Sequence, residues 1–513
     1  MKEESVNPSR LDRLFAWSDR RSELLNAILI REIRRTLNGK FFVISFLILL
    51  ALCLFWTLEI VFLGTSSTGR GGPMFTFFCL SLCGVTFLGL PLMVSELVGS
   101  ELKEQTLELL SITTITAARI VWGEMMTALG LFVLFASAVT PFMAFSYLLG
   151  GIDLRTIASG VAMAFLTTMF LSLVAVLGSL QKSGAMIKVA LGILAGIAFS
   201  LMAGLVGSGH LEELWDSPDI GIIILSVLST YLTLMGILFT AATARLTFAS
   251  ANRAGPLRLA IVVHLLQMGG LCFWGNEADG WMGWAIYSIS VLFLAGYAII
   301  GEDEALSRRL LRAGPLRRHL PGIYALFLPG ARRGLAFLFA VGALVTLLAT
   351  VAMMKKAPTL DLWDEAAVWA PGTAYAYQFP QGERVRVAKA AVWVPGTAYA
   401  YLVLFLSSAH GLCALLPAAF QRPFPRRVLL IVLFLATSLL PPIACLLMET
   451  RMKPAFAAIN PIFYFPVIYG RDHIDDFSNT LPITITLLSA AAVVFLAMLI
   501  PLSRGIAAAR PKP

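Results

Sequence analysis

Residues 41–63 read FFVISFLILLALCLFWTLEIVFL and contain a single charged side chain, Glu59. As a helix, a run of this length crosses the hydrocarbon core of a bilayer, which takes about 20 residues. It is longer than the apolar core of a cleavable signal peptide, about 7–15 residues. The first 40 residues are polar and basic, so we predict that residues 41–63 are retained as the first membrane span.

Similar runs recur along the whole chain. Of its 513 residues, 58% are hydrophobic and only 13% are charged, which is too little charge to cover a soluble globule. Apolar windows between charged or Gly/Pro-rich breaks predict an all-α, polytopic membrane protein with about twelve transmembrane helices. The windows are centred near Leu50, Val85, Val133, Leu171, Ala195, Leu232, Leu266, Val291, Val341, Leu406, Leu435 and Val493.

The distribution of Lys and Arg predicts the orientation of these spans. In a membrane protein the net charge of +9 is a topology signal rather than a sign of nucleic-acid binding. If the N-terminus is cytoplasmic, the loops on that side hold 29 of the 39 Lys and Arg. These segments are 1–40, 95–119, 181–188, 245–258, 301–333, 421–427 and the tail from Ser503. We therefore expect a multi-pass protein of the cell (inner) membrane with both termini cytoplasmic.

The loop after the ninth predicted helix is the exception. It places five positive charges outside, on Lys355, Lys356, Arg384, Arg386 and Lys389. It also contains a tandem duplication, since AAVWAPGTAYAY at 366–377 returns as AAVWVPGTAYAY at 390–401. One interpretation is a Trp/Tyr lip on the outer side of a substrate path. The others are an inserted β-hairpin and an aromatic anchor at the membrane interface.

One segment between the second and third spans is charged and rich in leucine: ELKEQTLELLSITTITAARIVWGE, residues 101–124. Leucine and threonine recur on one helical face, and glutamates line another. Such a helix is too polar to span, so it lies in the membrane interface or presses against a soluble partner. Thr116 is the predicted N-cap of the third span.

This segment resembles the region between the second and third spans of ABC-2-type transporter permeases, where a pattern like E-G-T-L-E-L-L-L-x-T-P-x-x-x-x-I-V-x-G-K recurs. The matching residues are Thr106, Leu107, Glu108, Leu109, Leu110, Thr114, Ile120, Val121 and Gly123. Gln105, Ile115 and Glu124 stand where Gly, Pro and Lys are usual. In that family the segment is a coupling helix that docks into a cleft of the ATPase. The resemblance therefore implies ATPase coupling by Glu104, Thr106, Leu107, Glu108, Leu109 and Leu110.

A second match precedes the first span. NAILIREIRRTLNGKFF, residues 26–42, has an apolar stripe and a basic stripe, as expected for a helix in the cytoplasmic interface. It is similar to the N-P-x-x-x-R-E-x-R opening of the same permeases, with Ala27 in place of Pro. There it forms an elbow helix, which implies that role for Arg31, Glu32, Arg34 and Arg35. A generic basic anchor is the alternative.

The resemblance covers roughly Asn26 to Arg258 and implies three parts. Residues 1–40 form a cytoplasmic segment with the elbow helix, and 41–258 form an ABC-2-like six-helix permease domain. Residues 259–513 form a second six-helix membrane domain that carries the duplicated extracytoplasmic loop 366–401. This second domain is either an added membrane domain or a diverged permease half.

The function implied is that of a permease subunit of an ABC exporter, working as a homodimer or paired permease within the lipid bilayer. The sequence lacks the P-loop pattern G-x-x-x-x-G-K-[ST], so ATP and magnesium are expected on a separate cytoplasmic ATPase subunit. We expect no enzymatic site, cofactor or metal in this chain, because no HExxH, GxSxG or CxxC pattern occurs. The alternative is an ATPase-independent carrier or scaffold. A carrier would need intramembrane ionisable groups, and Glu59, His264 and His410 are each isolated in the sequence.

Overall fold

The computed structural model describes residues 35–63, 71–103, 116–180, 184–248, 251–275, 278–300, 302, 326–356, 398–410 and 427–432. Among these residues every regular element is helical. The chain forms two compact units that divide after Thr247. The boundary predicted from the sequence lay at residue 258.

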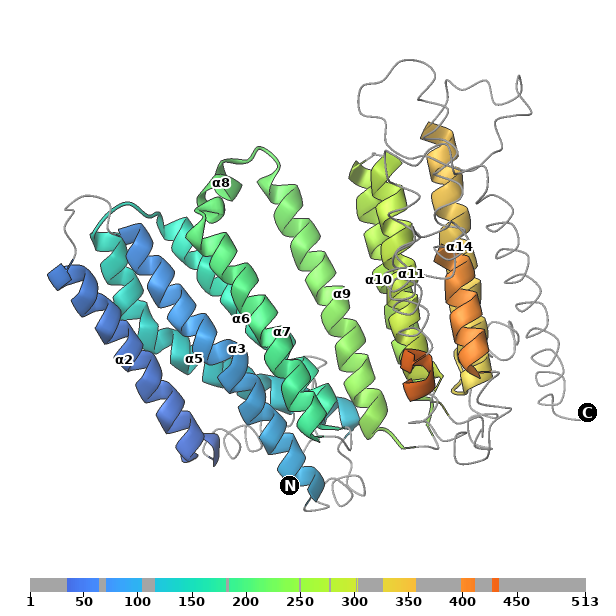
Figure 1. The fold of residues 1–513 in the computed structure, drawn as a ribbon, viewed down its shortest axis with the longest axis horizontal. Helices are drawn as coiled ribbons and strands as arrows, with labels where there is room; N and C mark the ends of the chain where they lie inside the picture. Colours follow the sequence, from blue (N-terminus) through green and yellow to red (C-terminus); the bar gives the residue numbers. More distant parts are fainter. Residues whose placement is uncertain are drawn as a thin grey trace, which may run out of the picture. The chain divides into compact units, whose positions relative to one another are not determined.

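The described residues of the first unit form seven helices, and six of them are long enough to span a membrane; Figure 1 shows their arrangement. They are α2 (Lys40–Leu63), α3 (Gly71–Lys103), α5 (Ala117–Leu148), α6 (Leu154–Ser179), α7 (Gly184–Gly207), the short α8 (His210–Asp216) and α9 (Ile220–Leu246). The second unit contains α10 (Ala254–Gly275), α11 (Ala278–Ile299), α14 (Ala331–Lys356), the helix Ala398–His410 and a helical turn at 427–432.

The prediction of an all-α, multi-pass membrane protein is confirmed. Within the described residues, eight helices are long and apolar enough to cross a bilayer, and two shorter apolar helices accompany them. Ten of the predicted centres fall in these helices, whereas Leu435 and Val493 lie outside the described residues. Most of the duplicated loop is also outside them. Its last four residues, 398–401, belong to a helix rather than to a loop.

The core of the first unit is built around α3. This helix contacts α2, α5, α6 and α7, and 67% of its apolar window is buried. Trp56 of α2 stacks on Phe77 with ring centroids 3.9 Å apart. On the α6 side, Gly160 allows close approach, because a Cβ there would lie 2.7 Å from Cζ of Phe75. A large aromatic side chain on α3 thus packs directly against the backbone of α6.

Several polar side chains inside these helices donate to carbonyls of their own helix, whereas the buried hydroxyls of Thr156 and Ser172 in α6 have no hydrogen-bond partner among the described residues. The buried Thr86 donates its hydroxyl to the Leu82 carbonyl at 2.8 Å, and Thr168 donates to Ala164 at 2.7 Å. Hydroxyls that bond to the preceding turn cost little inside an apolar bundle. Buried Ser and Thr that bond in this way are therefore compatible with membrane spans.

A backbone contact fixes the end of the bundle where α5 turns into α6. Gly150 and Gly151 have positive φ angles of 76° and 87°, which favour glycine at this tight connection. The Gly71 amide donates to the Gly150 carbonyl at 3.0 Å. A Cβ on Gly71 would lie only 2.3 Å from that oxygen. The start of α3 is thus held against the α5–α6 turn without intervening side chains.

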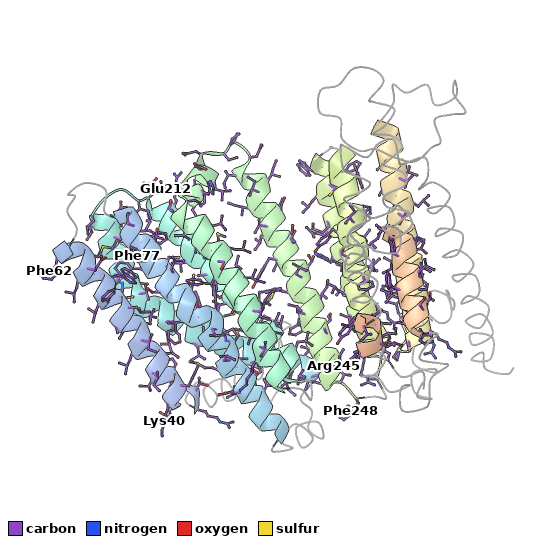
Figure 2. The ribbon with its side chains drawn as sticks, viewed as in Figure 1. Lys40, Phe62, Phe77, Glu212, Arg245 and Phe248 are labelled. Carbon is purple, nitrogen blue, oxygen red and sulfur yellow. The ribbon has the colours of Figure 1, made fainter. Side chains whose placement is uncertain are left out.

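The two ends of the first unit differ in chemical character. Figure 2 places Lys40 and Arg245 at one end, and Phe62 and Glu212 at the other. The acidic α8 therefore lies at the end opposite the start of α2. This arrangement follows from six long helices joined alternately at the two ends.

Helix α9 packs through one half only. Its residues that contact the hydrophobic core are Met235, Leu238, Phe239, Ala242 and Leu246, all in the second half. In the first half, Ile222, Leu225, Val227, Leu228 and Leu232 are 43–60% exposed. The first half of α9 therefore lies outside the hydrophobic core of its unit.

Candidate functional site

The predicted coupling segment joins α3 to α5. Its site residues, Glu104, Thr106, Leu107, Glu108, Leu109 and Leu110, lie outside the described residues. The structure gives the two helix ends that flank it: α3 continues to Lys103, and α5 begins at Ala117. In the sequence, residues 104–115 directly follow the most buried of the described long helices of the unit.

Thr116 occupies the N-cap position of α5, as the sequence predicts. Its backbone is extended, with φ −79° and ψ 150°, and its carbonyl accepts the first helical hydrogen bonds from Arg119 and Ile120. Its side chain makes no capping hydrogen bond. The start of α5 is therefore defined by backbone geometry rather than by the threonine hydroxyl.

Of the predicted elbow residues, Arg31, Glu32 and Arg34 lie outside the described residues. Arg35 is exposed on a short helical stretch, residues 35–37. The chain then turns at Asn38 and Gly39, where the Gly39 amide donates to Thr36 at 2.9 Å, before α2 begins. A distinct helical element therefore precedes the first span.

Charged side chains gather where α3 leaves the apolar part of the bundle. Glu96 of α3 pairs with Lys188 of α7 at 3.2 Å, and both side chains are more than half exposed. A surface pair of this kind adds about 0–1 kcal/mol to stability. It marks a polar end of the unit, from which α3 continues to Lys103.

Glu124 lies about two turns after the start of α5 and is only 6% exposed. It stands where the permease pattern has Lys. A carboxylate inside a helical membrane bundle is costly and is a candidate for function by default. Glu124, whose negative charge replaces the positive charge of the permease pattern, thus lies inside the first unit rather than on its surface.

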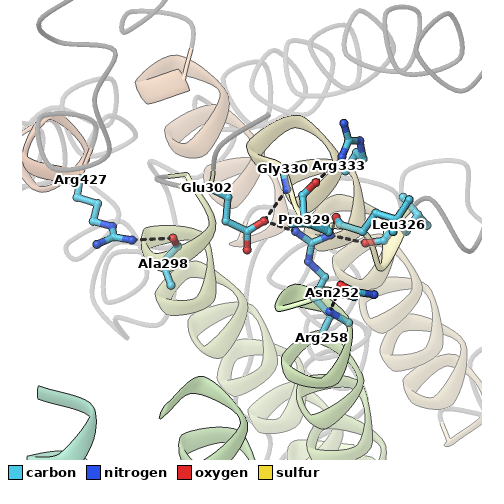
Figure 3. A network of polar contacts seen from close by, with 11 residues as sticks. Asn252, Arg258, Ala298, Glu302, Leu326, Pro329, Gly330, Arg333 and Arg427 are labelled. Atoms are coloured by element: carbon cyan, nitrogen blue, oxygen red, sulfur yellow. Dashed lines mark hydrogen bonds and ion pairs between the residues drawn. The ribbon is translucent and has the colours of Figure 1, made fainter. Parts of the chain in front are cut away.

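The second unit has a polar centre that the sequence analysis missed (Figure 3). From the sequence, Arg258 was predicted to lie in the loop 245–258, but the structure places it in a helix. It lies in the second turn of α10 and is fully buried. Its guanidinium donates from Nη1 to the carbonyls of Leu326 and Leu328 at 2.5 and 2.7 Å.

Glu302 neutralises this buried charge. Its Oε2 accepts hydrogen bonds from Arg258 Nη2 at 2.7 Å and from the Gly330 amide at 2.8 Å. One carboxylate oxygen thereby links the start of α10, the end of α11 and the residues that lead into α14. Since Arg keeps its proton in proteins, the Arg258 guanidinium is a fixed positive charge. The geometry of the Arg258–Glu302 pair is that of a structural link between helix ends.

The surroundings of the pair leave no room for a larger residue at Gly334. A Cβ there would lie 2.0 Å from Cγ2 of Ile299 and 2.8 Å from Nη2 of Arg258. The guanidinium also lies over the Phe337 ring, 5.8 Å from its centroid. Nearby, Arg427 donates to the Ala298 carbonyl at 3.2 Å. Four helix ends of the second unit thus meet around arginine side chains.

His264 pairs with a tyrosine inside the second unit. The fully buried Nε2 of His264 lies 2.7 Å from the Tyr287 hydroxyl of α11. A carrier would use such a group as one member of an ion or proton pathway. Within the described residues, no group of three His, Cys, Asp or Glu side chains could hold a metal ion. The geometry favours a packing histidine with a satisfied hydrogen bond.

No local sequence pattern indicates the buried Arg258, because its partners lie 44 to 70 residues away in the chain.

Comparison of the chain with family models, with characterised proteins and with solved structures finds no match.

Proposed function

We propose that this chain is the membrane-spanning permease subunit of an ABC exporter of the ABC-2 type, driven by a separate ATPase subunit. The observation that carries the proposal is the position of the charged segment. It follows α3 directly in the sequence, α3 is the most buried of the described long helices of the first unit, and the segment resembles the permease coupling helix.

The packing of α3 supports a mechanical role. Its 33 residues correspond to about 50 Å of helix, well beyond the roughly 30 Å of a bilayer core. It contacts four of the other five long helices of the first unit. A force applied by an ATPase at residues 104–115 would therefore reach most of the unit through one helix.

The proposal assigns ATP and magnesium to the partner subunit and makes this chain non-enzymatic. It also requires a second six-helix permease domain, because an export path lies between two of them. That domain is supplied by a second copy of the first unit, in a homodimer, or by a paired permease. The second unit of this chain is an added membrane domain or a diverged permease half.

The direct test is purification of the full chain in mild detergent from its own membranes. We expect it to retain a P-loop protein encoded beside its gene, and the complex to hydrolyse ATP. If the chain purifies alone and its transport persists without ATP, the alternative of an ATPase-independent carrier or scaffold replaces the proposal.

The orientation gives a separate prediction. A cysteine introduced at Ser111, on a background without the native cysteines, should stay unlabelled by a membrane-impermeant thiol reagent in intact cells. It should be labelled once the membrane is opened, because the positive charges place this segment in the cytoplasm. A cysteine at Thr373, in the duplicated loop, is the matched outer position and should be labelled in intact cells. Strong labelling at position 111 in intact cells would overturn the orientation.

A further inference from the structure

An apolar groove runs along the seam between α5 and α6. Its volume is about 760 Å³, and it is lined by the second half of α5 and the first half of α6. The lining includes Phe132, Val133, Met143, Ile157, Val161 and Phe165. The groove therefore lies toward the Gly150–Gly151 turn, at the end of the unit away from the charged end of α3.

The groove is present because α9 diverges from this face of α5. Trp122, near the start of α5, meets Phe239 of α9 edge to face at 6.4 Å. At 100° per residue, the groove positions Val133, Ser137 and Thr140 lie on the same side of α5 as Trp122. The second half of α9 thus covers this side near Trp122, whereas its exposed first half leaves the continuation open.

The lining suits a hydrocarbon chain and not a polar ligand. Its serine and threonine hydroxyls already donate within α5, since Thr140 donates to Ala136 at 2.8 Å and Ser137 donates to Leu134 at 2.9 Å. A polar ligand would lose hydrogen bonds to water or headgroups without replacing them. An apolar lining of this volume is typical of sites for apolar ligands.

The length of the groove and the residues at one of its ends both indicate a lipid ligand. From Leu154 to Phe165 the α6 side measures about 16 Å, close to the roughly 15 Å of one leaflet's hydrocarbon. At the end near the turn stand Tyr147, which lines the groove and is 49% exposed, and Arg155, which is exposed beside the lining residue Leu154. Tyr and Arg are typical of the headgroup level, and Arg attracts phosphate.

We infer that this groove holds one acyl chain of a bilayer phospholipid from the leaflet farther from the charged end of α3, with the phosphate toward Arg155. The lipid keeps the first half of α9 separated from the α5–α6 seam. The inference needs only the membrane location of the chain and holds whether or not an ATPase drives it.

The test is photolabelling of the full chain in vesicles of phosphatidylethanolamine and phosphatidylglycerol. A small fraction of the phospholipid carries a diazirine midway along one acyl chain, and the adducts are mapped by peptide mass spectrometry. We expect adducts on Val133, Ser137 and Ala162 to exceed those on Val189 and Ile193 of α7 several-fold. The two α7 side chains are 64% and 62% exposed and report on ordinary surrounding lipid.

Filling the groove should remove the selective labelling. Ala158 and Ala162 line it and are exposed, so Ala158→Phe with Ala162→Phe occupies the space without disturbing the core. The adducts at Val133 should fall several-fold, while the matched Ile193→Phe leaves them unchanged. Arg155→Gln should lower them as well, because the phosphate loses its charged contact.

Three results would overturn the inference. The first is labelling in the groove no higher than at Val189 and Ile193, which means surrounding lipid only. The second is efficient disulfide formation between Val133→Cys and Leu228→Cys, which means that α9 itself fills the groove. The third is a crosslink between two copies through Ser137→Cys, which means that the groove is a subunit interface.

Discussion

Replacing Leu109 and Leu110 together by alanine should release the proposed ATPase subunit from the purified chain while the membrane helices stay folded. Truncating a buried anchor at a protein interface costs about 2 kcal/mol, so two anchors weaken association by roughly a thousandfold. The same variant should lose transport-coupled ATP hydrolysis. Binding is measured by co-purification and by titration of the ATPase onto the permease in nanodiscs.

The matched control is Leu311→Ala, in the later basic segment ALSRRLLRAGPLRRHLPG, residues 305–322, which lacks the TLELL pattern. It should keep full ATPase binding. Thermal unfolding of both variants separates lost binding from lost folding. If the double variant retains the ATPase with unchanged hydrolysis, residues 104–110 form an ordinary interfacial helix and the coupling role is wrong.

Arg258→Met should destabilise the second unit by about 3–5 kcal/mol, the usual cost of removing one partner of a buried ion pair. Methionine fills part of the volume but leaves Glu302 facing a low-dielectric site and leaves the Leu326 and Leu328 carbonyls without their donor. For a unit of this size we expect the apparent melting temperature in detergent to fall by about 10 °C.

Two further variants isolate the cause. Arg332→Met removes an exposed arginine of α14 and should change the melting temperature little. Adding Glu302→Gln to Arg258→Met removes the uncompensated charge and should restore part of the loss. If Arg258→Met melts like Arg332→Met, the buried pair does not hold the helix ends together.

The positions of the spans could be predicted because each depends on local composition. A run such as 41–63 is apolar on every side, and its length alone indicates a membrane helix. Because such a run is apolar on every side, it does not indicate how the helix packs. The sequence of α9 therefore does not show which of its sides contacts the hydrophobic core, or that only its second half does so. The groove was therefore not predictable from the sequence.

The burial of Arg258 could not be predicted from the sequence for a different reason. Counting Lys and Arg by loop assumes that each charge near a helix end is solvated, and Arg258 lies four residues inside α10. Its burial depends on carbonyls and a carboxylate from segments distant in the chain, which no local pattern encodes. By contrast, Thr116 was placed correctly because an N-cap is a local feature, although its hydroxyl is not used.

The central position of α3 sets an order for assembly during synthesis. The ribosome delivers α3 when α2 is its only neighbour, and α5, α6 and α7 follow later. Until then, the surfaces of Phe75 and Phe78 must face lipid. The hydroxyls of Ser81 and Thr86 do not need those later helices, since they bond to Phe77 and Leu82 of the same helix. The helix that becomes the interior of the first unit can thus enter the bilayer with these two hydroxyls already hydrogen-bonded, before its later neighbours are made.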